Sequence, residues 1–172
     1  MTAKNSIEEC LEQPDHLLFT HRGCHVFVSE LLKRFPDENY AAKSIEINDG
    51  YGPPKSGFHI VACRDGFFVD AFGIRREKDY CLWLCGKRSR ADPKMPVPFV
   101  RWVEIESSDL LQTVNCNDPD EPLNKWDHVV QQDFVRIVEE RARKFIEPIR
   151  ERFQVSLLIE GSELRQVPLK VE

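Results

Sequence analysis

Three side chains that together make a thiol catalyst follow one another in this 172-residue sequence, as Cys24, His59 and Asp70. A cysteine nucleophile needs a base that takes its proton. The imidazole of that base in turn needs a carboxylate to fix its tautomer and support the imidazolium. We therefore predict that Cys24 is the nucleophile, His59 the base and acid, and Asp70 the group that orients His59.

The spacing of apolar residues predicts a buried helix that begins at Cys24. Gly23 precedes this helix and Pro36 ends it. Its apolar stripe, with helical spacing, is Cys24, Phe27, Val28, Leu31, Leu32 and Phe35. A thiol in the first turn lies near free backbone amides and the positive end of the helix dipole, which lowers its pKa. The backbone N–H of Cys24 is also well placed to donate to an oxyanion.

A β-hairpin is predicted to bring His59 and Asp70 together. The Asp-Gly pair at 65–66 separates two apolar stretches, and such a pair favours a two-residue turn because both residues need a positive φ. That turn pairs Arg64 with Phe67, and the same register puts His59 and Asp70 on one face, diagonal to one another. Side chains in this relation lie within reach of each other.

The stretch 23–73 resembles the core of papain-like and transglutaminase-like thiol enzymes. The residues that carry the resemblance are GCHVFVSELL at 23–32, FHIV at 58–61 and DGFFVDAFG at 65–73. They match a helix start bearing the cysteine, a strand bearing histidine and a strand reading roughly D-G-x-x-x-D. The resemblance implies a helix packed on an antiparallel sheet, a Cys-His-Asp triad, attack on an amide or isopeptide carbonyl, and no cofactor.

Two residues depart from the pattern of these enzymes, and an expected one is missing. His25 stands where an aromatic residue often follows the cysteine, and Val61 where tryptophan often follows the strand histidine. No glutamine lies at the short upstream distance expected of a papain-type oxyanion donor. The remaining candidates for oxyanion or substrate binding are Gln13, Thr20, His21, His25 and Gly57.

The whole chain reads as a single α+β domain over 1–172, with N-terminal helices packed on an antiparallel sheet. We expect a papain-like core at about 15–110 and a C-terminal helix and strand at 124–160. The predicted helices are 7–13, 24–35 and 127–153, the last kinked or split at Pro148. The predicted strands are 43–48, 58–64, 67–71, 80–85, 99–105 and 154–159. The segment 50–57 is predicted to be a mobile flap beside His59, and the tail after Gly161 to be loose.

Composition excludes several classes of protein. The 11 Phe, 3 Trp and 3 Tyr supply apolar surface that a disordered chain would lack, and the apolar runs are far shorter than a membrane span. A formal net charge of -5 argues against a chain-wide nucleic-acid surface. Because no secretory signal opens the chain, we expect the six cysteines to be thiols in a reducing cytoplasm. The oligomeric state is left open.

A zinc site is the other interpretation of the cysteines. Cys81 and Cys85 are four residues apart, as are His21 and His25, and Cys63 is nearby in the sequence. Structural zinc sites typically use Cys-x-x-Cys knuckles in loops, whereas residues 80–85 read as a buried strand. We therefore expect no metal.

The sequence predicts a cysteine-dependent hydrolase or acyltransferase that acts on an amide or isopeptide bond of a protein or peptide. A peptidase, a deamidase and a transglutaminase-like enzyme remain open, because all three form an acyl-thioester. The resemblance also fits a small bacterial or phage-borne hydrolase, or an effector delivered to a host or target cell. The alternative is a catalytically inactive domain that binds a protein through its basic segment 75–94 and its acidic segment 104–121.

Overall fold

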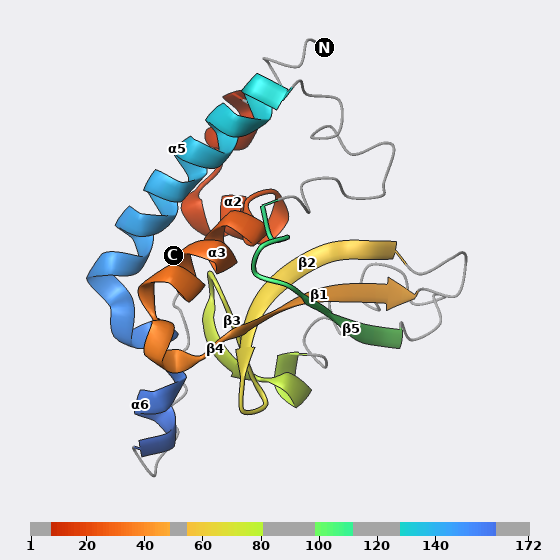
Figure 1. The fold of residues 1–172 in the computed structure, drawn as a ribbon, viewed down its shortest axis with the longest axis vertical. Coiled ribbons are helices and arrows are strands. Elements are labelled where there is room, and N and C mark those ends of the chain that lie inside the picture. The colour runs from red at the N-terminus through yellow and green to blue at the C-terminus, as the bar shows by residue number, and fades with distance from the viewer. Residues whose placement is uncertain (1–7, 49–54, 81–98, 112–127, 161–172) are drawn as a thin grey trace.

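The computed structural model describes residues 8–48, 55–80, 99–111 and 128–160, which form an α+β fold with a five-stranded antiparallel sheet (Figure 1). The helices are α2 (Asp15–His21), α3 (Cys24–Arg34), α5 (His128–Ile146) and α6 (Val155–Glu160), with 3-10 segments η1 (Pro36–Glu38) and η3 (Glu147–Phe153). The strands are β1 (Ala41–Asn48), β2 (Lys55–Arg64), β3 (Phe67–Asp70), β4 (Gly73–Arg76) and β5 (Phe99–Ile105). They lie in the order β4-β3-β2-β1-β5.

The hairpin between β2 and β3 confirms the predicted turn and register. Asp65 and Gly66 have φ values of 51° and 77°, so both turn residues are left-handed, and Gly66 adopts this conformation without strain. Arg64 pairs with Phe67, and the next two pairs along the strands follow the same register. Because side chains alternate along a strand, this register places His59 and Asp70 on one face of the sheet.

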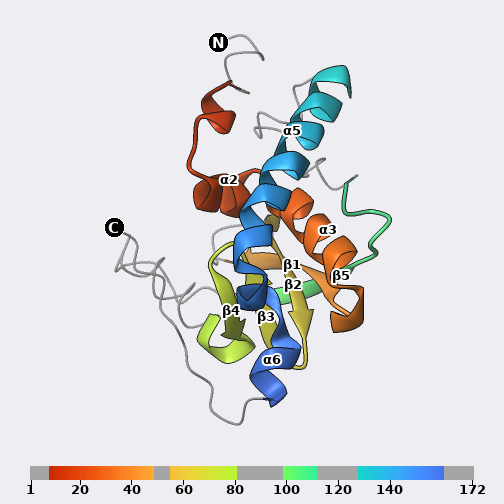
Figure 2. The same cartoon turned by 90° about the vertical axis from the view of Figure 1, so that its left-hand side faces the viewer.

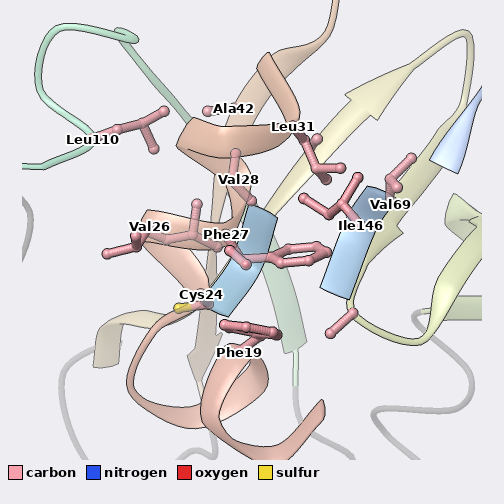
Figure 3. Packing of buried hydrophobic residues seen from close by; sticks show 14 of the residues in the cluster. Phe19, Cys24, Val26, Phe27, Val28, Leu31, Ala42, Val69, Leu110 and Ile146 are labelled. Carbon is pink, nitrogen blue, oxygen red and sulfur yellow. The ribbon is translucent and has the colours of Figure 1, made fainter. Parts of the chain in front are cut away.

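Helix α3 lies between the sheet and the long helix α5, as the two orthogonal views show (Figure 2). Its predicted apolar stripe is buried there, with Phe27 and Leu31 at most 1% exposed. Figure 3 shows Phe27 surrounded by side chains from other elements, including Phe19 of α2 and Ile146 of α5. The rings of Phe19 and Phe27 stack at 5.1 Å. Burying a side chain of this size contributes about 1.5–3 kcal/mol, so this cluster fixes where α3 begins.

A second, smaller cluster covers the opposite face of the sheet. Phe68 of β3 contacts Trp102 of β5 with ring centroids 4.4 Å apart, and the Tyr80 ring meets Phe68 edge-on at 5.6 Å. The two clusters bury alternate residues of β2, since Ala62 faces the helices and Val61 the second cluster. The central strands are therefore covered on both faces.

The C-terminal segment corrects one prediction. Pro148 does end the long helix, because α5 stops at Ile146 and Ile149 has non-helical angles within η3. Residues 155–160, however, form helix α6 and not the predicted strand. The first amides of α6 are held by distant residues: Val155 donates to the Tyr40 hydroxyl at 3.2 Å and Ser156 to the Glu38 carboxylate at 3.0 Å.

The structure also adds elements that the sequence patterns did not predict. Helix α2 and strand β4 lie in segments for which no element was predicted, and Tyr80 is helical with residues 77–79, whereas a strand was predicted to begin there. The helix predicted at 7–13 is observed at 8–11. Strand β2 begins at Lys55, so the last residues of the predicted flap are strand, whereas 49–54 lie outside the described residues. The tail after Gly161 also lies outside them.

Across the described ranges, no helix is long and apolar enough to cross a bilayer.

Candidate active site

The position of Cys24 is set by a close approach of three helices. Gly23 is the N-cap of α3, and a Cβ there would lie 2.9 Å from the Val138 side chain of α5 and 3.3 Å from the Leu18 carbonyl of α2. Any larger residue would push α3 away from its neighbours. The glycine thus lets the first turn of α3 sit deep in the molecule, where Cys24 is 7% exposed (Figure 3).

His59 and Asp70 are brought together by the β2–β3 hairpin, as predicted. His59 Nε2 lies 3.5 Å from Asp70 Oδ2, and the two residues are 5% and 2% exposed. This contact is longer than a normal hydrogen bond, and neither ring nitrogen of His59 makes one of full geometry among the described residues. Catalytic contacts are often long before a substrate binds and then tighten, so the geometry is compatible with a base and its orienting carboxylate.

The carboxylate of Asp70 is held by residues that the sequence analysis did not name. Its Oδ1 accepts from the backbone N–H of Phe72 at 2.8 Å, and its Oδ2 accepts from the Tyr80 hydroxyl at 3.2 Å. Arg75 Nη1 lies 3.9 Å from Oδ2. These three partners follow Asp70 within ten residues, because the chain reverses into β4 directly after β3. The sequence offered one signal for these partners, namely that a basic residue, Arg75, and an aromatic residue, Tyr80, follow the turn after Asp70.

Tyr80 also covers the imidazole of His59. The two rings are nearly parallel, at 8°, with centroids 6.5 Å apart. Burial and the neighbouring Asp70 carboxylate raise the pKa of Tyr80, so its hydroxyl stays protonated and donates. Tyr80 therefore packs against the imidazole of His59 and hydrogen-bonds the carboxylate of Asp70.

The electrostatics of the site distinguish Cys24 from an ordinary buried cysteine. Burial alone would raise its pKa, but the neighbouring imidazoles of His25 and His59 lower the pKa from 9.0 to about 5. For His59, burial alone would lower the pKa, yet the neighbouring Asp70 carboxylate and Cys24 thiolate raise it from 6.5 to about 9. Between about pH 5 and 9 the pair is therefore a thiolate facing an imidazolium.

The other described cysteines behave in the opposite way. Cys10 and Cys63 are buried free thiols, and burial raises the pKa of each. Among the described residues, no imidazole contributes to either shift. Cys81 and Cys85 of the zinc interpretation lie outside the described residues. Within the described ranges, no cluster of three or more histidine, cysteine or carboxylate side chains is suited to hold a metal ion.

Among the five candidates for oxyanion or substrate binding, the structure brings His25 to the thiol. The Thr20 hydroxyl donates to carbonyls within its own helix, at 2.8 and 3.2 Å. Gln13 uses its backbone carbonyl to accept from Arg141 at 2.9 Å. Gly57 lies in β2, two residues before His59. His21 is the last residue of α2, and its side chain lies outside what is described.

The charged segments of the alternative interpretation are described only in part. Residues 81–94 and 112–121 fall outside the described ranges, and of the basic residues that remain Arg75 approaches Asp70.

Comparisons of this chain with models of known protein families, with curated proteins and with solved structures found no match. Any function must therefore be argued from the geometry of the site itself.

Proposed function

We propose that this protein is a cysteine-dependent hydrolase or acyltransferase that acts on an amide or isopeptide bond of a protein or peptide. Cys24 is the nucleophile, His59 the base and acid, and Asp70 the orienting carboxylate. Within this proposal, α3 and the strands β1–β3 correspond to the core of papain-like and transglutaminase-like enzymes. The observation that carries it is the convergence of the three side chains, with the pKa of Cys24 lowered and that of His59 raised.

The reaction follows from the charge distribution. The Cys24 thiolate attacks the carbonyl carbon, a sulfur–carbon bond forms, and the π electrons of the carbonyl move to its oxygen. When the carbonyl re-forms, the carbon–nitrogen bond breaks and the imidazolium of His59 gives its proton to the leaving amine. Water or an amine then attacks the acyl-thioester carbonyl, His59 takes its proton, and the carbon–sulfur bond breaks to release the Cys24 thiolate. The acceptor decides between hydrolysis and acyl transfer.

Two further features support this setting. Cys10, Cys24 and Cys63 are all free thiols, which fits a reducing cytoplasm, the compartment we propose for this protein. Asp70 also accepts two hydrogen bonds and lies 3.9 Å from the Arg75 guanidinium, and a carboxylate held in this way fixes the orientation of a neighbouring imidazole.

The test is covalent labelling with a short peptide amide that carries a chloroacetamide group. With all labelling done at pH 6, we expect Cys24 to be labelled in the unsubstituted protein, with labelling abolished in Cys24→Ser and reduced about tenfold in His59→Ala. Cys63→Ser is the matched control, since it removes another buried thiol and should leave labelling unchanged. Equal labelling of Cys24 in the unsubstituted protein and in His59→Ala would contradict the proposal.

Hydrolysis is then measured on peptide and glutamine amide substrates with the same variants. Asp70→Asn should lower turnover strongly while leaving the fold intact, because the amide can favour the wrong imidazole tautomer. Turnover that survives in Cys24→Ser would place the chemistry elsewhere.

A further inference from the structure

We propose that His25 is the second donor of the oxyanion hole and acts together with the backbone N–H of Cys24. This inference rests on the proposed function, since it assigns a role in the same reaction. It also chooses among the five residues that the sequence left open. A histidine directly after the nucleophile would then be a catalytic residue in its own right.

The first observation is that His25 is buried against the nucleophile. Its side chain is in the first turn of α3, is 4% exposed and lowers the pKa of the adjacent Cys24 thiol. Its Nε2 is buried and has no hydrogen-bond partner among the described residues. A buried polar atom without a partner costs free energy, and native proteins leave few such atoms unpaired.

The second observation is the state of the α3 N-terminus. The first helical hydrogen bond runs from Phe27 N–H to Gly23 C=O, so the amides of Cys24, His25 and Val26 precede it. Gly23 has no side chain to cap them, and the first turn holds no acidic residue. This 11-residue helix therefore directs uncapped amides and a positive dipole end toward the thiol.

The chemistry joins the two observations. In the tetrahedral intermediate, the sulfur and the oxyanion are bonded to the same carbon, so the oxyanion forms beside the sulfur atom. Negative charge leaves the sulfur and appears on this oxygen when the sulfur–carbon bond forms. A donor that contacts the thiolate in the resting state is therefore next to the oxygen that becomes charged, and preorganised donors of this kind are the largest single source of rate enhancement.

His59 is not available for this task. Its proton must go to the leaving amine, and its ring is oriented by Asp70 and stacked on Tyr80. The hydroxyl of Thr20 already donates within its helix. Among the described side chains, His25 is the other donor whose neighbourhood lowers the pKa of the Cys24 thiol.

The experiment compares two reagents that use the same thiolate. Iodoacetamide alkylates sulfur at a saturated carbon and expels iodide, so no oxyanion forms. p-Nitrophenyl acetate transfers its acetyl group to sulfur through a tetrahedral oxyanion and expels p-nitrophenolate. The ratio of acylation to alkylation rate at Cys24, followed by mass spectrometry of the Cys24 peptide, therefore measures oxyanion stabilisation separately from thiolate formation.

Two substitutions that fill the volume of the buried His25 imidazole test its role as a donor. His25→Phe keeps a ring and removes the donors, and we expect acylation to fall by about 10²–10³ while alkylation changes by less than roughly tenfold. His25→Gln keeps an N–H donor and should recover most of the acylation. His16→Ala is the control for losing an imidazole: this residue lies on α2 with its ring 5.9 Å from Phe72, and the ratio should not change.

The outcomes separate this inference from the proposed function. An equal fall of both reactions in His25→Phe, or no fall in either, would overturn the oxyanion role of His25. A glutamine variant that alkylates normally and fails to acylate would also overturn it. If the unsubstituted protein never acylates at Cys24, the proposed function itself is wrong.

Discussion

The rate at which Cys24 is alkylated should depend on pH in a way that no ordinary cysteine shares. The perturbation is pH alone, and the reference is the same thiol in the urea-unfolded chain. In the folded protein the pKa of Cys24 is about 5, against an ordinary value of 9.0. The thiolate is the reactive form, so the folded rate should rise to about pH 6 and then stay level up to about pH 9, where His59 loses its proton.

The magnitude follows from two opposing effects. At pH 7, about 99% of the folded thiol and about 1% of the unfolded thiol is thiolate, a factor of roughly 100. The nucleophilicity of a thiolate falls as the pKa of its thiol falls. A Brønsted coefficient of about 0.45, applied to a pKa difference of about four, makes the folded thiolate about 60-fold slower. The two effects nearly cancel at pH 7. They favour the folded protein by roughly 15-fold at pH 6 and the unfolded chain by roughly 30-fold at pH 9.

The assay is iodoacetamide alkylation between pH 4 and 9.5, with each cysteine quantified separately by peptide mass spectrometry. Burial slows the folded reaction by a factor that does not change with pH, so the shape of the curve carries the test. His59→Ala should move the rise toward the ordinary value. A folded rate that increases tenfold per pH unit from pH 6 to 8 would refute the thiolate–imidazolium pair.

Three other substitutions test how the site is held, each by urea unfolding. Tyr80→Phe removes the hydroxyl that donates to Asp70 and keeps the ring, so the free energy of unfolding should fall by about 1–2 kcal/mol; no change would mean that this hydrogen bond contributes nothing. Gly23→Ala forces a methyl group against the fully buried Val138, so the free energy of unfolding should fall by about 1–3 kcal/mol and Cys24 should be alkylated more slowly. A stabilised variant would contradict the close approach of α3 to α5. Glu38→Ala removes the buried carboxylate that accepts from the Ser156 amide of α6 and pairs with Arg64 at 2.7 Å. The expected loss is about 3 kcal/mol, and a loss below about 0.5 kcal/mol would show that α6 is held by other contacts.

The parts of the fold that carry the site could be predicted because their signals are local. The helix at Cys24 follows from an apolar stripe of helical period, and the turn at 65–66 from two residues that tolerate a positive φ. Once the turn is placed, alternation along the strands dictates that His59 and Asp70 share a face. Each step uses only neighbours in the chain.

The parts that could not be predicted depend on contacts between distant residues. Segment 155–160 is helical because Tyr40 and Glu38, more than 110 residues away, accept its first amides. The contact of Tyr80 with Asp70 appears only after the chain has reversed into β4. His25 was named because it follows Cys24, and its contact with the thiol needed the three-dimensional structure.

The three residues of the candidate site are unevenly spaced along the chain. His59 and Asp70 are 11 residues apart across one hairpin, whereas Cys24 and His59 are 35 apart and meet only when α3 docks on β2. Short loops close before long ones, so we expect the hairpin to form early in folding and the thiol to arrive late. Until then Cys24 keeps the pKa of an ordinary cysteine and is mostly protonated at neutral pH. A nascent or partly unfolded chain therefore carries Cys24 as an unreactive thiol, and the thiolate forms only when the fold is complete.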